Sequence, residues 1–284
     1  MNIILAKKRG FCSGVKRAVG LAFSEAEKQE RPVVILHELV HNDAVVQELK
    51  EHDIVIVEDP AEAPHDSTLI FSAHGVSSAV ENAARSLPLN IIDATCPLVK
   101  HVHTIAAARS GAGDVILLAG KRGHREVEGI LGRIGGESHL LTSPVDAEKF
   151  IPDPARSYTL VSQTTFFTND FAAIRRILEK KIPDLHVENT ICPSTIMRQE
   201  AVRKLAVECD LVIVVGSPGS SNSKRLCETA ESVGTRAVLM GGDDPFPEAL
   251  QAVETLGVTS GASASEKEVA HLLKRLDKFF KKLG

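Results

Sequence analysis

The sequence predicts an α/β fold built mainly from parallel β-sheets. Short apolar segments rich in β-branched residues recur along the chain, and segments with apolar residues three and four positions apart lie between them. This alternation is typical of parallel strands joined by crossover helices. With 284 residues, of which 43% are hydrophobic, the chain can bury a large core, and its length suggests about two domains.

Eleven short apolar segments are predicted to be strands: Asn2–Ala6, Val33–Leu39, Ile54–Val57, Thr68–Ala73, Asn90–Ala94, Val115–Ala119, His139–Leu141, Tyr158–Ser162, Leu211–Gly216, Ala237–Met240 and Gly257–Ser260. Segments with helical spacing lie between them: Val15–Lys28, Val45–Lys50, Val80–Arg85, Val99–Arg109, Phe171–Lys180, Thr195–Glu208 and Lys224–Ser232. Eleven strands are too many for one short sheet, so they form either one wide sheet or several small α/β units. The spacing of the motifs below favours three units, residues 13–97, 98–191 and 192–284, with Cys12 and Cys96 at the edges of the first.

The C-terminal segment, residues 265–284, is predicted to be a helix that closes the third unit. Its apolar residues fall on one stripe, with lysines elsewhere: Val269, Leu272, Leu273, Leu276 and Phe280. Such a stripe indicates a helix packed on the core, and the alternative is a helix that lies on a membrane surface.

The charge balance and the apolar pattern exclude several classes of protein. The 33 basic and 37 acidic residues, a net charge of −4, leave no general basic surface for bulk binding of nucleic acid or anionic lipid. No apolar run approaches the length of a membrane span, and Ile3–Ala6 is too short for the core of a signal peptide. We therefore expect a cytoplasmic protein that needs neither a membrane nor a nucleic acid.

Three of the five cysteines occur in the same local setting. Cys12 in RGFCSGVKR, Cys96 in DATCPLVKH and Cys192 in NTICPSTIM each follow a predicted strand and precede a helical segment. Proline, which is favoured at the first helical position, follows the second and third of them. The N–H groups and dipole of a helix N-terminus favour thiolate over thiol. Separations of 84 residues (96 − 12) and 96 residues (192 − 96) suggest one such cysteine per unit, all facing a common centre.

Cysteines in a reducing compartment are packing residues, metal ligands or nucleophiles rather than a disulfide framework. Three thiolates in one repeated setting favour metal binding. A zinc ion with water in its fourth position fits, and so does a four-iron cluster with one iron open to substrate. The spacing alone does not distinguish the two. Cys209 and Cys227 lack the setting and are expected to be packing residues.

Histidines and hydroxyl residues follow several of the same strands. In parallel α/β units the ligand site lies beyond the carboxyl ends of the strands, so these side chains should be neighbours. The set comprises His41, Asn42, His74, His124, Thr164 and Thr165. A second set, at the start of a helix in VGSPGSSNS (residues 215–223) and in the later SGAS, has the glycines and hydroxyls of an anion site: Ser220, Ser221, Asn222 and Ser263. Because VGSPGSSNS lacks the GxxxxGK[ST] pattern, the residues indicate a pocket for a compact diphosphate rather than an ATP-cleaving loop.

Glu126 is the carboxylate expected to act in this pocket. It is predicted to lie in a loop, two residues after His124, where it could relay protons near a bound phosphate and a metal cluster. Glu128, two residues further on, is the alternative.

Taken together, these motifs resemble those of the 4-hydroxy-3-methylbut-2-enyl diphosphate reductase family, the LytB-type family of the methylerythritol phosphate pathway. The matching motifs follow in order over essentially the whole chain: GFCSGV, HNxxVV (from His41), SAHGVS, DATCPLV, GHxEVEG, SQTT, RQEAV and SSNS. The resemblance implies three α/β domains in a trefoil-like, pseudo-threefold arrangement around a central 4Fe-4S cluster, held by Cys12, Cys96 and Cys192.

The resemblance also implies an iron-sulfur oxidoreductase of isoprene biosynthesis. Its reaction would be the reductive dehydroxylation of 4-hydroxy-3-methylbut-2-enyl diphosphate to isopentenyl diphosphate and dimethylallyl diphosphate, with two electrons and two protons, at the open iron of the cluster. Ferredoxin or flavodoxin would donate the electrons to a monomeric protein, and loss of the unligated iron would leave a 3Fe-4S cluster. The substrate would be bound by His41, His74, His124, Thr164, Ser220, Ser221, Asn222 and Ser263. Glu126, Thr164 and His124 would be catalytic, with Glu126 delivering protons through Thr164.

The sequence departs from the family pattern without losing a proposed ligand. Met197 precedes RQ where a polar residue is usual, Arg125 stands where a proline is usual, Pro218 and Gly219 replace a Lys-Asn pair, and Ser265 replaces a proline. Two other functions fit the same residues: a zinc-dependent hydrolase or transferase acting on a phosphorylated substrate, and a non-catalytic iron-sulfur regulator associated with RNA. A zinc protein would be colourless, and turnover of the hydroxylated diphosphate would exclude the regulator.

Overall fold

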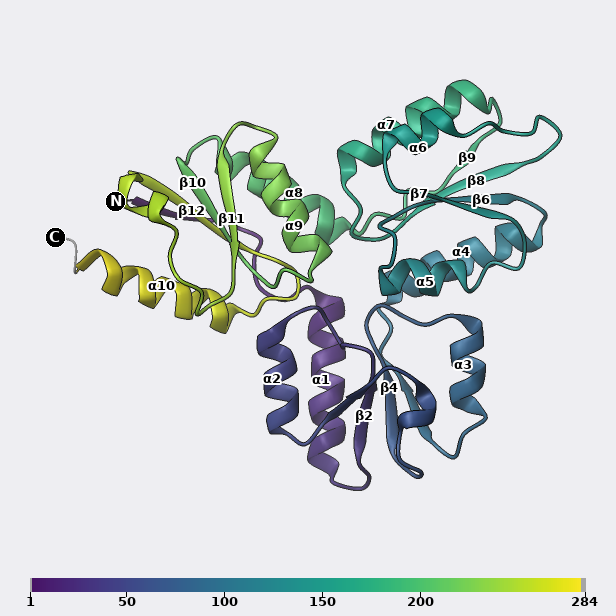
Figure 1. The fold of residues 1–284 in the computed structure, drawn as a ribbon, viewed down its shortest axis with the longest axis horizontal. Helices are drawn as coiled ribbons and strands as arrows, with labels where there is room; N and C mark the ends of the chain where they lie inside the picture. The colour runs from purple at the N-terminus through teal and green to yellow at the C-terminus, as the bar shows by residue number, and fades with distance from the viewer. Residues whose placement is uncertain (1, 282–284) are drawn as a thin grey trace. The chain divides into compact units, whose positions relative to one another are not determined.

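The computed structural model describes residues 2–281, and within this range the chain forms three parallel four-stranded β-sheets with helices on their faces (Figure 1). The chain divides into two compact units. The terminal unit comprises the residues up to Val15, His41–Ala44 and the residues from Pro193 onward, and the central unit comprises Lys16–Val40 and Val45–Cys192. The expectation of three small α/β sheets, rather than one wide sheet, is confirmed. The boundaries at 13–97, 98–191 and 192–284 and the pseudo-threefold arrangement stay predictions.

Sheet A lies in the terminal unit and has the strand order β1-β12-β10-β11. Its strands are β1 (Asn2–Leu5), β10 (Leu211–Val215), β11 (Arg236–Met240) and β12 (Thr255–Ser260). Its helices are α8 (Pro193–Ala206), α9 (Ser221–Glu231), the 3-10 helix η2 (Glu248–Ala252) and α10 (Glu266–Lys281). Because successive side chains of a strand point to opposite faces, β10 contributes to two cores, one under α10 and one under α8 and α9 (Figure 1).

The closing helix predicted at the C-terminus is present as α10. Its buried residues Val269, Leu272 and Leu276 pack against sheet A, so this helix covers the core as expected. Residues 282–284 of the predicted helix lie outside the described residues. Within residues 2–281, no helix has the length and the apolar character needed to cross a bilayer.

Sheet B lies in the central unit and has the order β3-β2-β4-β5. Its strands are β2 (Val33–Leu36), β3 (Val55–Val57), β4 (Thr68–Phe71) and β5 (Asn90–Asp93). The inner strands β2 and β4 are buried at every residue, as expected for parallel strands covered on both faces. Figure 1 shows α1 and α2 on one face and α3 on the other. The helical segments are α1 (Ser13–Lys28), α2 (Asp43–Glu51), the 3-10 helix η1 (Pro60–Glu62) and α3 (Ser78–Arg85).

Sheet C, also in the central unit, has the order β7-β6-β8-β9. Its strands are β6 (Val115–Ala119), β7 (Ser138–Leu141), β8 (Tyr158–Ser162) and β9 (His186–Val187). Its helices are α4 (Pro97–Gly111), α5 (Arg125–Leu131), α6 (Pro144–Lys149) and α7 (Thr168–Lys181). One core lies beneath α6 and α7, and a second lies beneath α4 and α5 (Figure 1).

Besides the two 3-10 helices, three elements were not expected from the sequence: β9, α5 and α6. Each is short, with two, seven and six residues, so the apolar repeat that identifies a longer element has no room to develop. The prediction that Glu126 lies in a loop is therefore wrong. It lies in the first turn of α5, whose buried residues Val127 and Ile130 pack under sheet C.

The registers of the three sheets bring particular loops to the same edge. In sheet A, Val215 at the end of β10 pairs with Ser260 at the end of β12. In sheet B, Phe71 pairs with Asp93, and in sheet C, Ala119 pairs with Ser162. Because the chain leaves parallel strands at one edge, the loops that carry the predicted site residues start beside each other within each sheet.

Candidate active site

Cys12 lies in the terminal unit at the point where helix α1 begins. Its backbone N–H donates a hydrogen bond to the Ala262 carbonyl at 3.0 Å, which holds the cysteine beside the loop that follows β12. The N–H of Val15, in the first turn of α1, points at Cys12 Sγ at 3.5 Å. The Cys12 sulfur therefore accepts from the first turn of α1, at the start of the helix.

Cys96 and Cys192 occupy matching positions in the central unit. Cys96 is the N-cap residue of α4, with Pro97 at the first helical position, and Cys192 directly precedes Pro193, where α8 begins. The Cys96 N–H donates to the Ala73 carbonyl at 3.1 Å, and the Cys192 N–H donates to the Thr164 carbonyl at 2.9 Å. Each cysteine is therefore tied through its backbone to a loop that carries another predicted site residue. That the three sulfurs share one metal cluster stays a prediction.

The remaining two cysteines are packing residues, as expected. Cys209 and Cys227 pack against the core beneath α8 and α9. Burial, with smaller contributions from neighbouring carboxylates, raises the pKa of Cys209 to about 11 and that of Cys227 to about 12. Both thiols therefore stay protonated near neutral pH and are poor metal ligands.

Glu126 is buried in the central unit and is held by one residue. Its side chain is 2% exposed. The Thr164 N–H donates to Oε1 at 2.6 Å, and the Thr164 hydroxyl donates to Oε2 at 3.0 Å. Thr164 lies in the loop after β8, and the paired ends of β6 and β8 bring this loop next to the start of α5. The carboxyl group is thus held in position by a residue that lies 38 positions further along the chain.

The environment of Glu126 suits a group that exchanges protons near neutral pH. Burial raises the pKa of this carboxyl from its ordinary 4.5 to about 7, although the two hydrogen bonds from Thr164 act to lower it. Glu128, the alternative considered from the sequence, is exposed and pairs with Arg125, so Glu126 is the better candidate for proton transfer. An acid or base works best when its pKa lies near the working pH.

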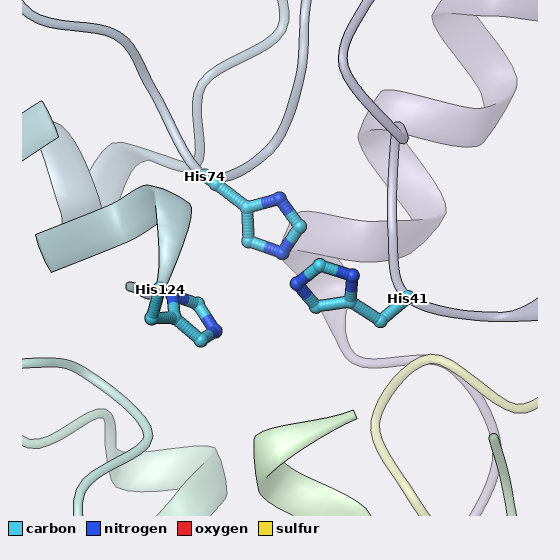
Figure 2. Close-up of side chains that lie close together, drawn as sticks. All are labelled: His41, His74 and His124. Atoms are coloured by element: carbon cyan, nitrogen blue, oxygen red, sulfur yellow. The ribbon is translucent and has the colours of Figure 1, made fainter. Parts of the chain in front are cut away.

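His124 caps the helix that carries Glu126. The Glu126 N–H donates to Nδ1 of His124 at 3.1 Å, so Nδ1 is an acceptor and the neutral ring carries its proton on Nε2. His74, in the loop after β4, lies beside it, with ring centroids 5.4 Å apart in an edge-to-face arrangement (Figure 2). The prediction that histidines from different strand ends are neighbours is confirmed for these two.

The predicted anion residues of the terminal unit lie together at the start of α9. Ser220 caps the helix by accepting from the Ser223 N–H at 3.2 Å. Ser263 Oγ lies 3.5 Å from Ser220 Oγ and donates to the His41 carbonyl at 3.1 Å. Asn42, another of the predicted pocket residues, donates from Nδ2 to the Ser263 carbonyl at 2.7 Å. Two loops and the His41 segment therefore surround one helix N-terminus.

Two donors in this helix terminus are positioned for a ligand. Within residues 2–281, Ser221 Oγ and Asn222 Nδ2 are buried and have no hydrogen-bond partner. A buried polar atom without a partner is costly, and a bound anion at a helix N-terminus would satisfy such donors. This supports the anion site proposed from VGSPGSSNS.

The departures from the family pattern leave these residues in place. Arg125 takes the first position of α5 and pairs with Glu58 at 2.5 Å. The Gly219 position faces His41, and a Cβ there would lie 3.7 Å from the His41 Cβ, an ordinary contact distance. Met197 is 43% exposed on α8.

Comparisons with known proteins agree with the motifs. The family model described as LytB protein matches residues 3–277. The 4-hydroxy-3-methylbut-2-enyl diphosphate reductase of Shewanella pealeana is 43% identical over 284 residues, covering 98% of this chain and 92% of that protein. The 4-hydroxy-3-methylbut-2-enyl diphosphate reductase 2 of Burkholderia mallei is 42% identical over 279 residues, covering 97% and 85%.

Two solved structures have the same fold. The E-1-hydroxy-2-methyl-but-2-enyl-4-diphosphate reductase from Plasmodium falciparum superimposes with a TM-score of 0.93 at 33% identity, covering 97% of this chain and 87% of that one. A second structure, that of (E)-4-hydroxy-3-methyl-but-2-enyl diphosphate reductase, the terminal enzyme of the non-mevalonate pathway, superimposes with a TM-score of 0.70 at 30% identity, covering 98% of this chain and 99% of that one. Since both the family model and the relatives span nearly the whole chain, this chain belongs to the LytB protein family.

Proposed function

We propose that this chain is a 4-hydroxy-3-methylbut-2-enyl diphosphate reductase. The reaction consumes two electrons and two protons, breaks the carbon–oxygen bond of the substrate's hydroxyl group, and releases water together with isopentenyl diphosphate or dimethylallyl diphosphate. The observation that carries the proposal in this chain is the buried Glu126–Thr164 pair. The Glu126 carboxyl, with a pKa of about 7, is hydrogen-bonded to Thr164. The backbone carbonyl of Thr164 in turn accepts from the N–H of Cys192, a candidate metal ligand.

The three cysteines fit an iron-sulfur cluster by their chemistry. Each lies at a helix N-terminus, and cysteine thiolates are the ligands that such clusters require. We propose that Cys12, Cys96 and Cys192 hold a 4Fe-4S cluster. When bound, the cluster would supply the electrons and, at the iron without a cysteine, a Lewis acid for the departing oxygen.

The diphosphate would be bound by neutral donors rather than by a basic patch. In the terminal unit, Ser221 Oγ and Asn222 Nδ2 are buried donors that lack a hydrogen-bond partner among the described residues. Oxygens of a bound diphosphate would accept hydrogen bonds from both. We propose that Ser220, Ser263 and His41 of the same unit bind the substrate too. From the central unit, His74, His124 and Thr164 are the proposed ligands, with the Nε2 proton of His124 as a donor.

Glu126 would supply protons through Thr164. The Thr164 hydroxyl lies 3.0 Å from Oε2 of Glu126. When Glu126 is protonated on Oε2, the hydroxyl accepts that proton and donates its own proton onward to the substrate. The carboxyl then carries the negative charge until solvent reprotonates it. This step needs the protonated carboxyl, which is the form that burial favours up to about pH 7.

The proposal is tested by anaerobic purification followed by iron and sulfide analysis, a visible spectrum, and turnover of the hydroxylated diphosphate with an artificial reductant. Replacing Cys12, Cys96 or Cys192 with Ser should remove the brown colour and the iron. The matched controls Cys209→Ser and Cys227→Ser should keep both. A colourless wild-type protein that binds zinc would instead support a zinc-dependent hydrolase or transferase, and an intact cluster without turnover would support the non-catalytic regulator.

Three further parts of the proposal concern the setting of the enzyme. Ferredoxin or flavodoxin would donate the electrons, the chain would work as a monomer, and it would reside in the cytoplasm, where its thiols stay reduced. Reduction of the cluster by purified ferredoxin or flavodoxin, followed in the visible spectrum, tests the first of these.

A further inference from the structure

Arg198 is a buried cation that the proposed reaction does not use. It lies in the second turn of α8, within the RQEAV motif, and its side chain is 4% exposed. Arginine stays charged at every accessible pH, and burying a charge is expensive unless hydrogen bonds compensate it. The partners of this guanidinium group therefore indicate what it is there to do.

The guanidinium group of Arg198 donates to two turns of the terminal unit that are far apart in the chain. Nη2 donates to the Gly10 carbonyl at 2.6 Å, and Nη1 donates to the Ser260 carbonyl at 3.2 Å. Gly10 lies two residues before Cys12, and Ser260 ends β12, three residues before Ser263. One side chain thus binds both the turn of a proposed metal ligand and the turn of a proposed diphosphate ligand.

The same two turns are also bonded to each other. The Gly10 N–H donates to Ser260 Oγ at 2.7 Å, and the Cys12 N–H donates to the Ala262 carbonyl at 3.0 Å. Gly10 has φ +73, and a Cβ there would lie 2.7 Å from Glu266 Oε1, so only glycine fits this turn without strain. The two turns therefore form one assembly with Arg198 bound to both.

A guanidinium group suits this position better than an ammonium group. Two carbonyl oxygens directed at one point repel each other, and a cation between them removes that repulsion. The planar fork of arginine binds two acceptors at a fixed angle, whereas the ammonium of lysine is a point charge on a flexible stem. Hydrogen bonds from a charged donor are about twice as strong as neutral ones.

We propose that Arg198 is a positioning residue whose guanidinium fork sets the Cys12 turn and the Ser263 turn relative to each other. The inference rests on the proposed function, because it assigns diphosphate binding to the Ser263 turn. Through this turn Arg198 acts on Ser263, whose hydroxyl contacts the His41 carbonyl and Ser220. Loss of the fork removes none of the proposed diphosphate ligands, but it lets the loop that carries Ser263 move away from the position that binds the diphosphate.

The test uses the anaerobically purified, cluster-containing protein and the variants Arg198→Lys and Arg198→Met. We expect the dissociation constant for inorganic diphosphate, measured by calorimetry, to rise at least about tenfold in both variants. The matched control is Lys204→Met on the same helix, which also removes a cation. Lys204 is 74% exposed and pairs with Glu200, so this variant should bind diphosphate like the wild type.

A merely structural role for Arg198 would lower the melting temperature without changing the dissociation constant of the folded protein. The inference is therefore overturned if either variant, once folded, binds inorganic diphosphate within about twofold of the wild type. If Arg198→Met does not fold, Arg198→Lys decides alone. Full recovery in Arg198→Lys overturns it too, because the charge alone would then suffice.

The same measurements separate this inference from the proposed function. A wild-type protein that binds inorganic diphosphate but does not reduce the hydroxylated diphosphate overturns the proposed function only. A wild-type protein that turns over the substrate, with variants that bind diphosphate equally well, overturns the role of Arg198 only. A wild-type protein that does not bind inorganic diphosphate overturns the inference about Arg198.

Discussion

Replacing Glu126 with Gln should make the stability of this protein less dependent on pH. Gln has nearly the same shape as Glu, and its amide can still accept from the Thr164 N–H and donate to the Thr164 hydroxyl. The substitution therefore removes the titration of a buried carboxyl, which is 2% exposed, and leaves the surrounding hydrogen bonds possible.

The sign of the effect follows from the raised pKa. Burial raises the pKa of Glu126 from 4.5 to about 7, so between these values the folded protein binds more protons than the unfolded chain. The stability that this group contributes is complete below about pH 4.5 and is lost as the pH rises through about 7. Above that pH the wild type carries the full cost of a buried carboxylate, whereas the Gln variant does not titrate.

The magnitude follows from the same two values. One pKa unit corresponds to about 1.4 kcal/mol, so the complete loss is about 3 kcal/mol. Because part of this loss of stability has already occurred at pH 5, the loss between about pH 5 and about pH 8 is roughly 2.5 kcal/mol. The free energy of unfolding of Glu126→Gln, relative to the wild type, should rise by this amount over the interval.

Urea unfolding followed by far-ultraviolet circular dichroism at both pH values measures this difference. Glu128→Gln is the matched control, since this residue lies in the same helix with a side chain that is 51% exposed. The control should show a change with pH well under about 1 kcal/mol. If the free energies of unfolding of Glu126→Gln and of the wild type change with pH in parallel, burial does not raise the pKa of Glu126. The argument for its role as a proton donor then fails.

Three other outcomes are expected. The turnover number should fall about tenfold per pH unit above roughly pH 7, since protonated Glu126 is the donor; a flat profile up to about pH 9 contradicts this role. Asn222→Ala should weaken calorimetric binding of inorganic diphosphate about tenfold, yet change the free energy of unfolding by less than about 1 kcal/mol, because Nδ2 has no partner within residues 2–281; unchanged affinity removes Asn222 from the site. Gly75→Ala should destabilise by about 2–4 kcal/mol in urea, because Gly75 has φ +75 and a Cβ would lie 2.7 Å from His103 Cε1. Adding His103→Ala should recover about 1 kcal/mol or more, and strict additivity of the two substitutions would show that this contact is not the cause.

The sequence by itself determined the longer elements and the local setting of the candidate metal ligands. At Cys96 a strand, a cysteine and a helix that begins with proline are neighbours in the chain, so this order can be read from adjacent residues, and the structure has it. At Cys192 the sequence indicates the cysteine and the proline that begins the helix, but not the short strand β9 before them. The eleven predicted strands are present for the same reason, because each is an apolar run with its own pattern. The helix α5 was missed since seven residues are too few to show a helical repeat.

The tertiary structure alone decided the chemistry of individual side chains. Glu126 and Glu128 are nearly equivalent in the sequence, but of the two only Glu126 is buried and hydrogen-bonded to Thr164, which lies 38 positions further along the chain. Arg198 reaches Gly10 across 188 residues, and no local pattern indicates that contact. The physical reason is that a pKa depends on which atoms exclude water from the group and which donors reach it. Those atoms come from segments that only folding brings together.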